Sequence, residues 1–166
     1  MSEVNKLVQR NQWASYMDTG TSDAEEYNLM GDGFTSLTES KNPKEYSRQY
    51  VNMATEATDV VGYAPSIAYA CDVYSGDPCI QKIMKITDDE AVGTDAQVPI
   101  VNVNLWTGTE EAREATRRMY SVIPDSKGDG TDALVISGNF KAVGDQVKGT
   151  FNTNTKKFTA STATNV

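Results

Sequence analysis

The chain has 166 residues, of which 39% are hydrophobic, and its 15 basic and 23 acidic residues give a formal net charge of −8. This acidic balance argues against tight binding to nucleic acid or to an anionic membrane, since both need clusters of Lys and Arg. The length suits one domain with a substantial core, and no stretch approaches the roughly 18 apolar residues that cross a bilayer. The N-terminus lacks the apolar segment of a secretory signal, so we expect synthesis in the cytosol.

The first part of the chain predicts an arm, two short strands and a polar connection. Residues 1–10 are polar and form the expected arm. Residues 13–17 and 26–30 are short apolar runs that end in turn residues, which is typical of strands. Residues 34–42 are mostly polar and predict a connection without regular structure.

Strict alternation predicts a strand over residues 44–53, just after Pro43, which cannot donate to a ladder. One face carries Tyr46, Arg48 and Tyr50. We interpret this face as the buried one, because aromatic side chains at alternate positions are more often core than a stacking surface for sugars or bases. Arg48 is then expected to be stacked or paired between the two tyrosines.

The next segment predicts a loop, a strand and a helix. Residues 54–59 are expected to form the loop, and residues 66–74 alternate most clearly of all. The inward side chains of that strand are predicted to be Ile67, Tyr69, Cys71 and Val73.

A single helix is predicted to begin after Asp77, which can cap the free N–H groups, and Pro78 suits its first position. Its apolar side chains recur at helical spacing, and the pattern ends near Ile86. Acidic residues follow, which would lie badly at a negative helix C-terminus, so residues 87–97 are expected to form a loop.

The C-terminal half predicts strands, with one ambiguous segment. Residues 98–106 and 133–143 alternate as strands, residues 124–130 and 144–145 are rich in turn residues, and 146–151 and 156–159 are short strands. Residues 109–120 have a composition that favours helix, but their side chains also alternate as in a strand. From the residues alone both interpretations of 109–120 stay open.

Together these elements predict a mainly β fold, a β-sandwich or open barrel with one flanking α-helix. We expect one domain over residues 11–160, preceded by the arm and followed by a loose tail at 161–166.

The sequence offers little chemistry. It has no histidine, which excludes Ser-His-Asp and Cys-His arrangements, and its acidic pairs lie in polar runs that would not raise a pKa. Cys71 and Cys79 are expected to be free, buried thiols rather than a disulfide, and two cysteines alone make no zinc site. We therefore expect no catalytic residue, no metal and no cofactor, and a protein that is not an enzyme.

The one basic concentration is Arg113, Arg117 and Arg118. Three arginines could contact a phosphate, but in a chain of net charge −8 we interpret them as partners of nearby acidic residues.

Four segments resemble, in order, the tail tube (major tail) proteins of long-tailed bacteriophages and prophages of Gram-positive bacteria. They are 11–13 (NQW), 42–51 (NPKEYSRQYV), 59–67 (DVVGYAPSI) and 144–151 (GDQVKGTF). The residues that carry the resemblance are Trp13, Asn42, Pro43, Glu45, Tyr46, Arg48, Tyr50, Val51, Asp59, Val60, Val61, Gly62, Tyr63, Pro65, Ile67, Gly144, Gly149 and Phe151.

The resemblance implies a structural subunit, with a fold related to type VI secretion tube proteins, that forms hexameric rings stacked into a hollow tube for DNA ejection. It favours a strand at 109–120. It implies self-association, tape measure, initiator and terminator proteins as partners, and a sheath in a contractile tail. It also implies a place in the virion after assembly in the host cytoplasm. DNA would pass through without tight binding, and the acidity would either repel DNA phosphates in the lumen or only provide solubility.

Three alternatives are weighed against this hypothesis. The chain could be a β-sandwich module that binds or decorates a virion, or the tube subunit of a tail-derived bacteriocin or contractile injection particle. The third, a small hydrolase that uses surface carboxylates, is remote because histidine is absent.

Overall fold

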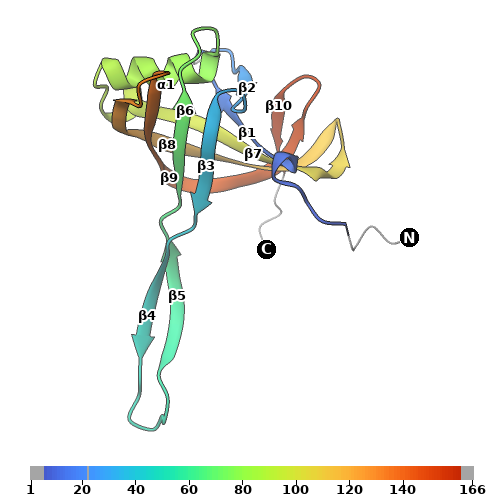
Figure 1. Ribbon diagram of the computed structural model, residues 1–166. Helices are drawn as coiled ribbons and strands as arrows, with labels where there is room; N and C mark the ends of the chain where they lie inside the picture. Colours follow the sequence, from blue (N-terminus) through green and yellow to red (C-terminus); the bar gives the residue numbers. More distant parts are fainter. Residues whose placement is uncertain (1–5, 22, 162–166) are drawn as a thin grey trace.

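One curled sheet of eight antiparallel strands forms the body of the molecule (Figure 1). The computed structural model describes residues 6–21 and 23–161. The strands run in the order β2-β1-β7-β8-β9-β6-β3, and β10 also pairs with β9. Their bounds are β1 Trp13–Asp18, β2 Tyr27–Leu29, β3 Phe34–Ser40, β6 Ser66–Asp72, β7 Gln97–Thr109, β8 Ala112–Asp129, β9 Val135–Asn152 and β10 Lys157–Ala160. The prediction of a mainly β fold with one flanking α-helix is confirmed.

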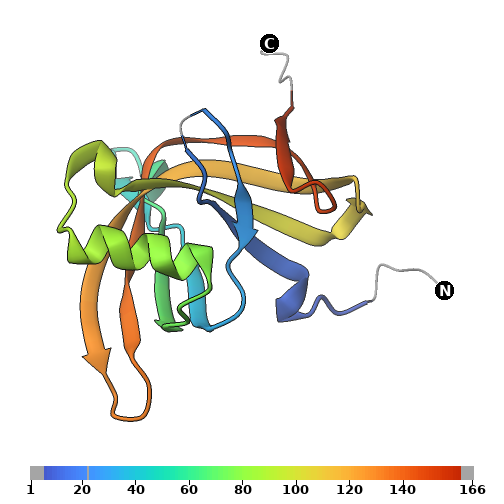
Figure 2. The same cartoon turned by 90° about the horizontal axis from the view of Figure 1, so that it is seen from above.

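The helix α1, Pro78–Asp88, lies across the sheet and covers the larger of two core clusters (Figure 2). Asp77 caps it as predicted, because its carboxylate accepts hydrogen bonds from the backbone N–H groups of Cys79 and Ile80 at 2.9 and 3.2 Å. Ile80 and Ile83 are fully buried against the sheet. A short 3₁₀ helix, Gly93–Ala96, interrupts the segment that was expected to be a loop.

A second, smaller core cluster includes Tyr16, Tyr27 and Phe151. The ring of Phe151 lies 4.5 Å from that of Tyr16 and meets the ring of Tyr27 edge to face at 5.9 Å. Val98 and Val101 are both fully buried, and they belong to the larger and smaller clusters respectively. Adjacent strand positions point to opposite faces, so β7 serves both clusters with one nearly continuous apolar run.

The strands β4, Pro43–Arg48, and β5, Ala57–Tyr63, form a separate two-stranded sheet that projects far from the body (Figure 1). The predicted burial of Tyr46 and Tyr50 is wrong, since they are 43% and 54% exposed. The predicted strand 44–53 is also too long, because β4 ends at Arg48 and Tyr50 lies in the connection to β5. Within the described residues, no part of the body covers the face that carries Tyr46. Arg48 does stack on both rings, with its guanidinium carbon 4.6 and 5.6 Å from the ring centres.

Two further expectations in this region need correction. The predicted polar connection 34–42 contains the strand β3, whose Leu37 is buried between polar neighbours. The predicted loop at 54–59 ends earlier, because β5 begins at Ala57. In both places mostly polar residues form a strand because they pair with a neighbouring strand. Strand β3 pairs with β6, and the first residues of β5 pair with β4.

The C-terminal strands are longer than predicted. Strands β8 and β9 have 18 residues each, so the segment 109–120 is mostly strand, and the expected turn at 124–130 lies largely within β8. The expected turn at 144–145 lies inside β9 and is also wrong. The register moves from Met119↔Val143 to Arg117↔Val147 there, so a bulge absorbs the extra residues without reversing the chain.

The predicted arm at 1–10 falls partly outside the described residues. Residues 1–5 are not described, residues 6–9 have no regular structure, and Arg10–Gln12 form a short 3₁₀ helix that leads into β1. Of the predicted loose tail at 161–166, residues 162–166 lie outside the described part.

Candidate assembly surface

The projecting pair β4–β5 is called here the hairpin arm (residues 43–63). Hydrogen bonds of Asn42 close its base, where the arm joins the body. Asn42 has a φ of 47°, and its side-chain amide donates to the carbonyl of Ala64 at 3.0 Å and to the hydroxyl of Ser66 at 3.2 Å. The backbone N–H of Ala64 in turn donates to the Asn42 carbonyl at 3.2 Å. Asparagine tolerates this left-handed conformation and supplies the bonds that close the base of the arm.

The hairpin arm exposes large apolar side chains and contributes none to either core cluster. An isolated two-stranded hairpin is marginally stable in water, and clustered exposed apolar groups mark interaction surfaces. The exposed residues are Tyr46, Tyr50, Val51, Val60, Val61 and Tyr63. Most residues that carry the family resemblance therefore lie on a projection suited to contact another molecule.

The remaining predicted residues lie in the body and do not join the hairpin arm in one site. Ile67 and Phe151 are core residues, and Trp13 begins β1. Gly149 packs against β10 so closely that a Cβ there would lie 2.1 Å from the carbonyl oxygen of Thr159. Gly144 lies in the β9 bulge with a φ of 79°. Their roles are in folding.

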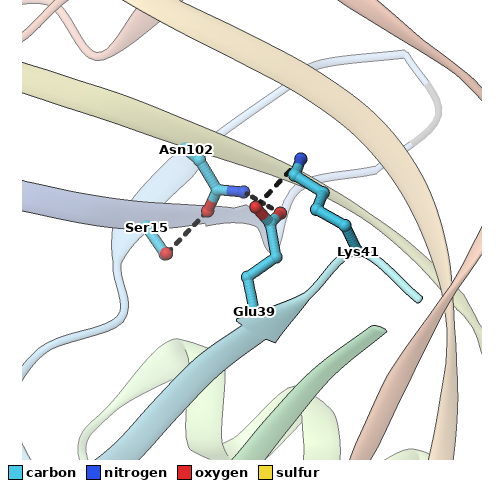
Figure 3. Close-up of polar contacts among 4 residues, drawn as sticks. All are labelled: Ser15, Glu39, Lys41 and Asn102. Atoms are coloured by element: carbon cyan, nitrogen blue, oxygen red, sulfur yellow. Dashed lines mark hydrogen bonds and ion pairs between the residues drawn. The ribbon is translucent and has the colours of Figure 1, made fainter. Parts of the chain in front are cut away.

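A polar network that the sequence did not predict links β3, the last strand of the sheet, to the neighbouring strands β7 and β1 (Figure 3). The Ser15 hydroxyl on β1 donates to the side-chain carbonyl of Asn102 on β7 at 2.7 Å. The Asn102 amide donates to Glu39 on β3 at 3.3 Å, and Lys41 pairs with the same carboxylate at 3.0 Å. These residues are 63 to 87 positions apart along the chain where they bond across the sheet, so no local pattern could have found them.

The network borders a polar cavity of about 190 Å³ that Arg118 and Tyr120 also line. Burial raises the pKa of the Tyr120 hydroxyl to about 12, so the phenol stays protonated at neutral pH. Within the described residues, no three His, Cys, Asp or Glu side chains are grouped to hold a metal ion. We interpret this cavity as a polar space inside the curl of the sheet, whose lining side chains bond to one another.

Two of the three clustered arginines, Arg113 and Arg117, contact the chain's own groups. Arg117 pairs with Glu25 at 3.5 Å and lies over the ring of Phe158 at 5.1 Å. Arg113 donates to the carbonyl of Thr107 at 3.0 Å. The expected pairing with an acidic residue is thus confirmed for Arg117.

The two cysteines are free and buried, as predicted. Burial raises the pKa of each thiol to about 12, so both stay protonated up to strongly alkaline pH.

We expect a thiol reagent at pH 8 to label neither Cys71 nor Cys79 in the folded protein and to label both after denaturation. The unfolded thiols ionise near pH 9, so above that pH the free energy of unfolding should fall as pH rises towards about 12. Rapid labelling of the folded protein would contradict their burial.

No protein-family model and no curated protein matches this sequence. Solved structures do match, and among them is a chain in a cryo-electron microscopy structure of the anti-feeding prophage baseplate, six-fold symmetrised. The match has a TM-score of 0.50 and 8% sequence identity, and it covers 89% of this chain and 97% of that chain. The chain thus has a fold that also occurs in the anti-feeding prophage baseplate. Of the described helices, none is long and apolar enough to cross a membrane.

Proposed function

We propose that the protein is the tail tube subunit of a phage or prophage, which assembles into hexameric rings that stack into a conduit for DNA. The observation that carries this proposal is the hairpin arm. A projection with exposed strands and exposed Tyr and Val side chains needs a partner surface, and a second copy of the chain is the simplest partner.

The direction of the arm supports stacking. The hairpin arm and helix α1 lie at opposite ends of the molecule (Figure 1). If an arm contacts a different surface on the next copy, the contact is head-to-tail, and such contacts produce rings or open filaments rather than closed dimers. Repetition of this contact along one axis would build a tube.

The acidic charge fits a conduit through which DNA moves without tight binding, because a negative wall repels phosphates. On this proposal the protein resides in the virion tail, is assembled in the host cytoplasm, and has no catalytic role. Tape measure, initiator and terminator proteins would be its further partners.

A second candidate function is favoured by the comparison. The similar chain belongs to a baseplate, so this chain could instead serve in the baseplate of a tail-derived particle. A baseplate component would join other subunits at one level of the particle and would not polymerise without limit.

Negative-stain electron microscopy of the purified protein at increasing concentration, with and without a tail initiator complex, distinguishes these functions. The tube proposal predicts hollow tubes whose length grows with protein concentration. Single rings that never elongate in the presence of initiator would favour the baseplate function. A protein that stays monomeric under both conditions would contradict the tube proposal.

A further inference from the structure

The strand β3 has one edge that pairs with β6 and one edge that no strand covers within the described residues. In an antiparallel pair, alternate residues direct both backbone groups towards or away from the partner. The Ala64 N–H donates to the Asn42 carbonyl, and β3 and β6 continue this register at Ser40↔Ser66 and Thr38↔Ala68, so these even-numbered positions of β3 face β6. Leu37 and Glu39 then direct their N–H and C=O groups to the free edge.

This free edge faces β1 across a groove of about 690 Å³, called here the seam. Apart from an irregularity between Phe34 and Ser36 and the charged Glu39, the edge of β3 has little protection against pairing with another chain, because residues 35–38 are Thr, Ser, Leu and Thr, with no Lys or Pro. An uncovered strand of this kind is a template for a further strand.

Arg10 is the side chain that spans the seam. Its guanidinium donates to the carbonyl of Trp13 on β1 at 2.8 Å and to the carbonyl of Leu37 on β3 at 3.1 Å. It also lies over the indole ring of Trp13, 5.1 Å from the ring centre. A fork of charged donors thus occupies the outward carbonyl of β3 that an added strand would need.

The Arg10 side chain can also be released from these two carbonyls without unfolding the body. It is exposed to solvent and belongs to the short 3₁₀ helix Arg10–Gln12, beyond which residues 6–9 extend away from the body (Figure 2). The Glu39–Asn102 bond closes the same gap from inside the sheet and does not cover the outward groups of β3. Release of one exposed side chain would therefore free the edge while the body stays folded.

We propose that Arg10 masks the free edge of β3 in the isolated subunit, and that assembly replaces this contact with a strand from a second copy of the chain. The inference rests on the proposed self-assembly and adds a control on it. A second copy is the occupant because each copy also carries uncovered strand edges on its hairpin arm, so the chain supplies both the open edge and strands able to pair with it.

The test compares Arg10→Ala with Lys6→Ala. Both variants remove one positive charge from the N-terminal segment that precedes β1. We expect Arg10→Ala to assemble at a concentration about ten-fold lower than the wild type, the change expected for loss of one charge-assisted hydrogen bond that competes with pairing. Lys6→Ala should assemble as the wild type does. Light scattering and analytical ultracentrifugation give these concentrations.

Hydrogen exchange provides a second readout that does not depend on the variant. The amides of Leu37 and Glu39 should exchange at least about ten-fold more slowly in assembled wild-type protein than in free subunits, because pairing protects them. Unchanged exchange at both amides, or equal assembly concentrations for Arg10→Ala and Lys6→Ala, would overturn the inference.

Failure of the masking role of Arg10 can be told apart from failure of the tube proposal. If the wild type forms no tubes, the tube proposal fails, yet Arg10→Ala should still self-associate at concentrations where the wild type is monomeric. A monomeric Arg10→Ala protein would then overturn the masking role. If the alanine variant does not fold, Arg10→Lys carries the same expectation, because a lysine cannot bridge the two carbonyls with a planar fork.

Discussion

Replacement of residues 43–63 by a two-residue Asn-Gly turn is expected to abolish tube formation and to leave the body folded. The hairpin arm contributes no residue to either core cluster, so its loss should change the melting temperature of the body little. The backbone groups of Asn42 and Ala64 already bond at 3.2 Å, so a tight turn can join the strands at that point. Electron microscopy and calorimetry on the same preparation measure the two effects.

A finer variant tests which property of the hairpin arm matters. Serine at Val60, Val61 and Tyr63 together should prevent assembly, since it removes exposed apolar surface and leaves the backbone in place. Val92→Ser is the matched control, because Val92 is also highly exposed but lies on the body. Normal tubes from the triple variant would show that the arm's apolar side chains are not part of the contact.

Local patterns predicted strand β6 and the helix cap well, because these depend on neighbouring residues. Alternation over 66–74 and the pair Asp77–Pro78 required no knowledge of the rest of the chain. The same alternation around Tyr46 misled, because period two indicates a strand but not what covers its faces. Whether a face of a strand is buried depends on what packs over it. The hairpin arm projects beyond the body, so the body does not cover the face that carries Tyr46 (Figure 1).

Turn residues misled for a related reason. Gly144 and Asp145 are typical of a tight turn, yet pairing with β8 on both sides of them holds β9 as one bulged strand. The seam was equally invisible. Arg10 and Leu37 are 27 positions apart, and only the curl of the sheet brings them together. Contacts of this range follow from topology, so the seam was not predicted, and the residues of the hairpin arm were identified by the resemblance but their exposure was not predicted.

Replacing Ile67 with Ala is expected to lower the free energy of unfolding by about 3 kcal/mol, because the side chain is 1% exposed and the sheet cannot collapse around the cavity. Tyr50→Ala should change it by less than about 0.5 kcal/mol, because Tyr50 lies outside both core clusters. Urea unfolding of both variants measures the difference. A loss of several kcal/mol in Tyr50→Ala would mean that the arm is packed against the protein, and its free surface could then not serve a second copy. The pair of variants thus separates residues that hold the fold from residues left for assembly, although Ile67 and Tyr50 both carry the resemblance described above.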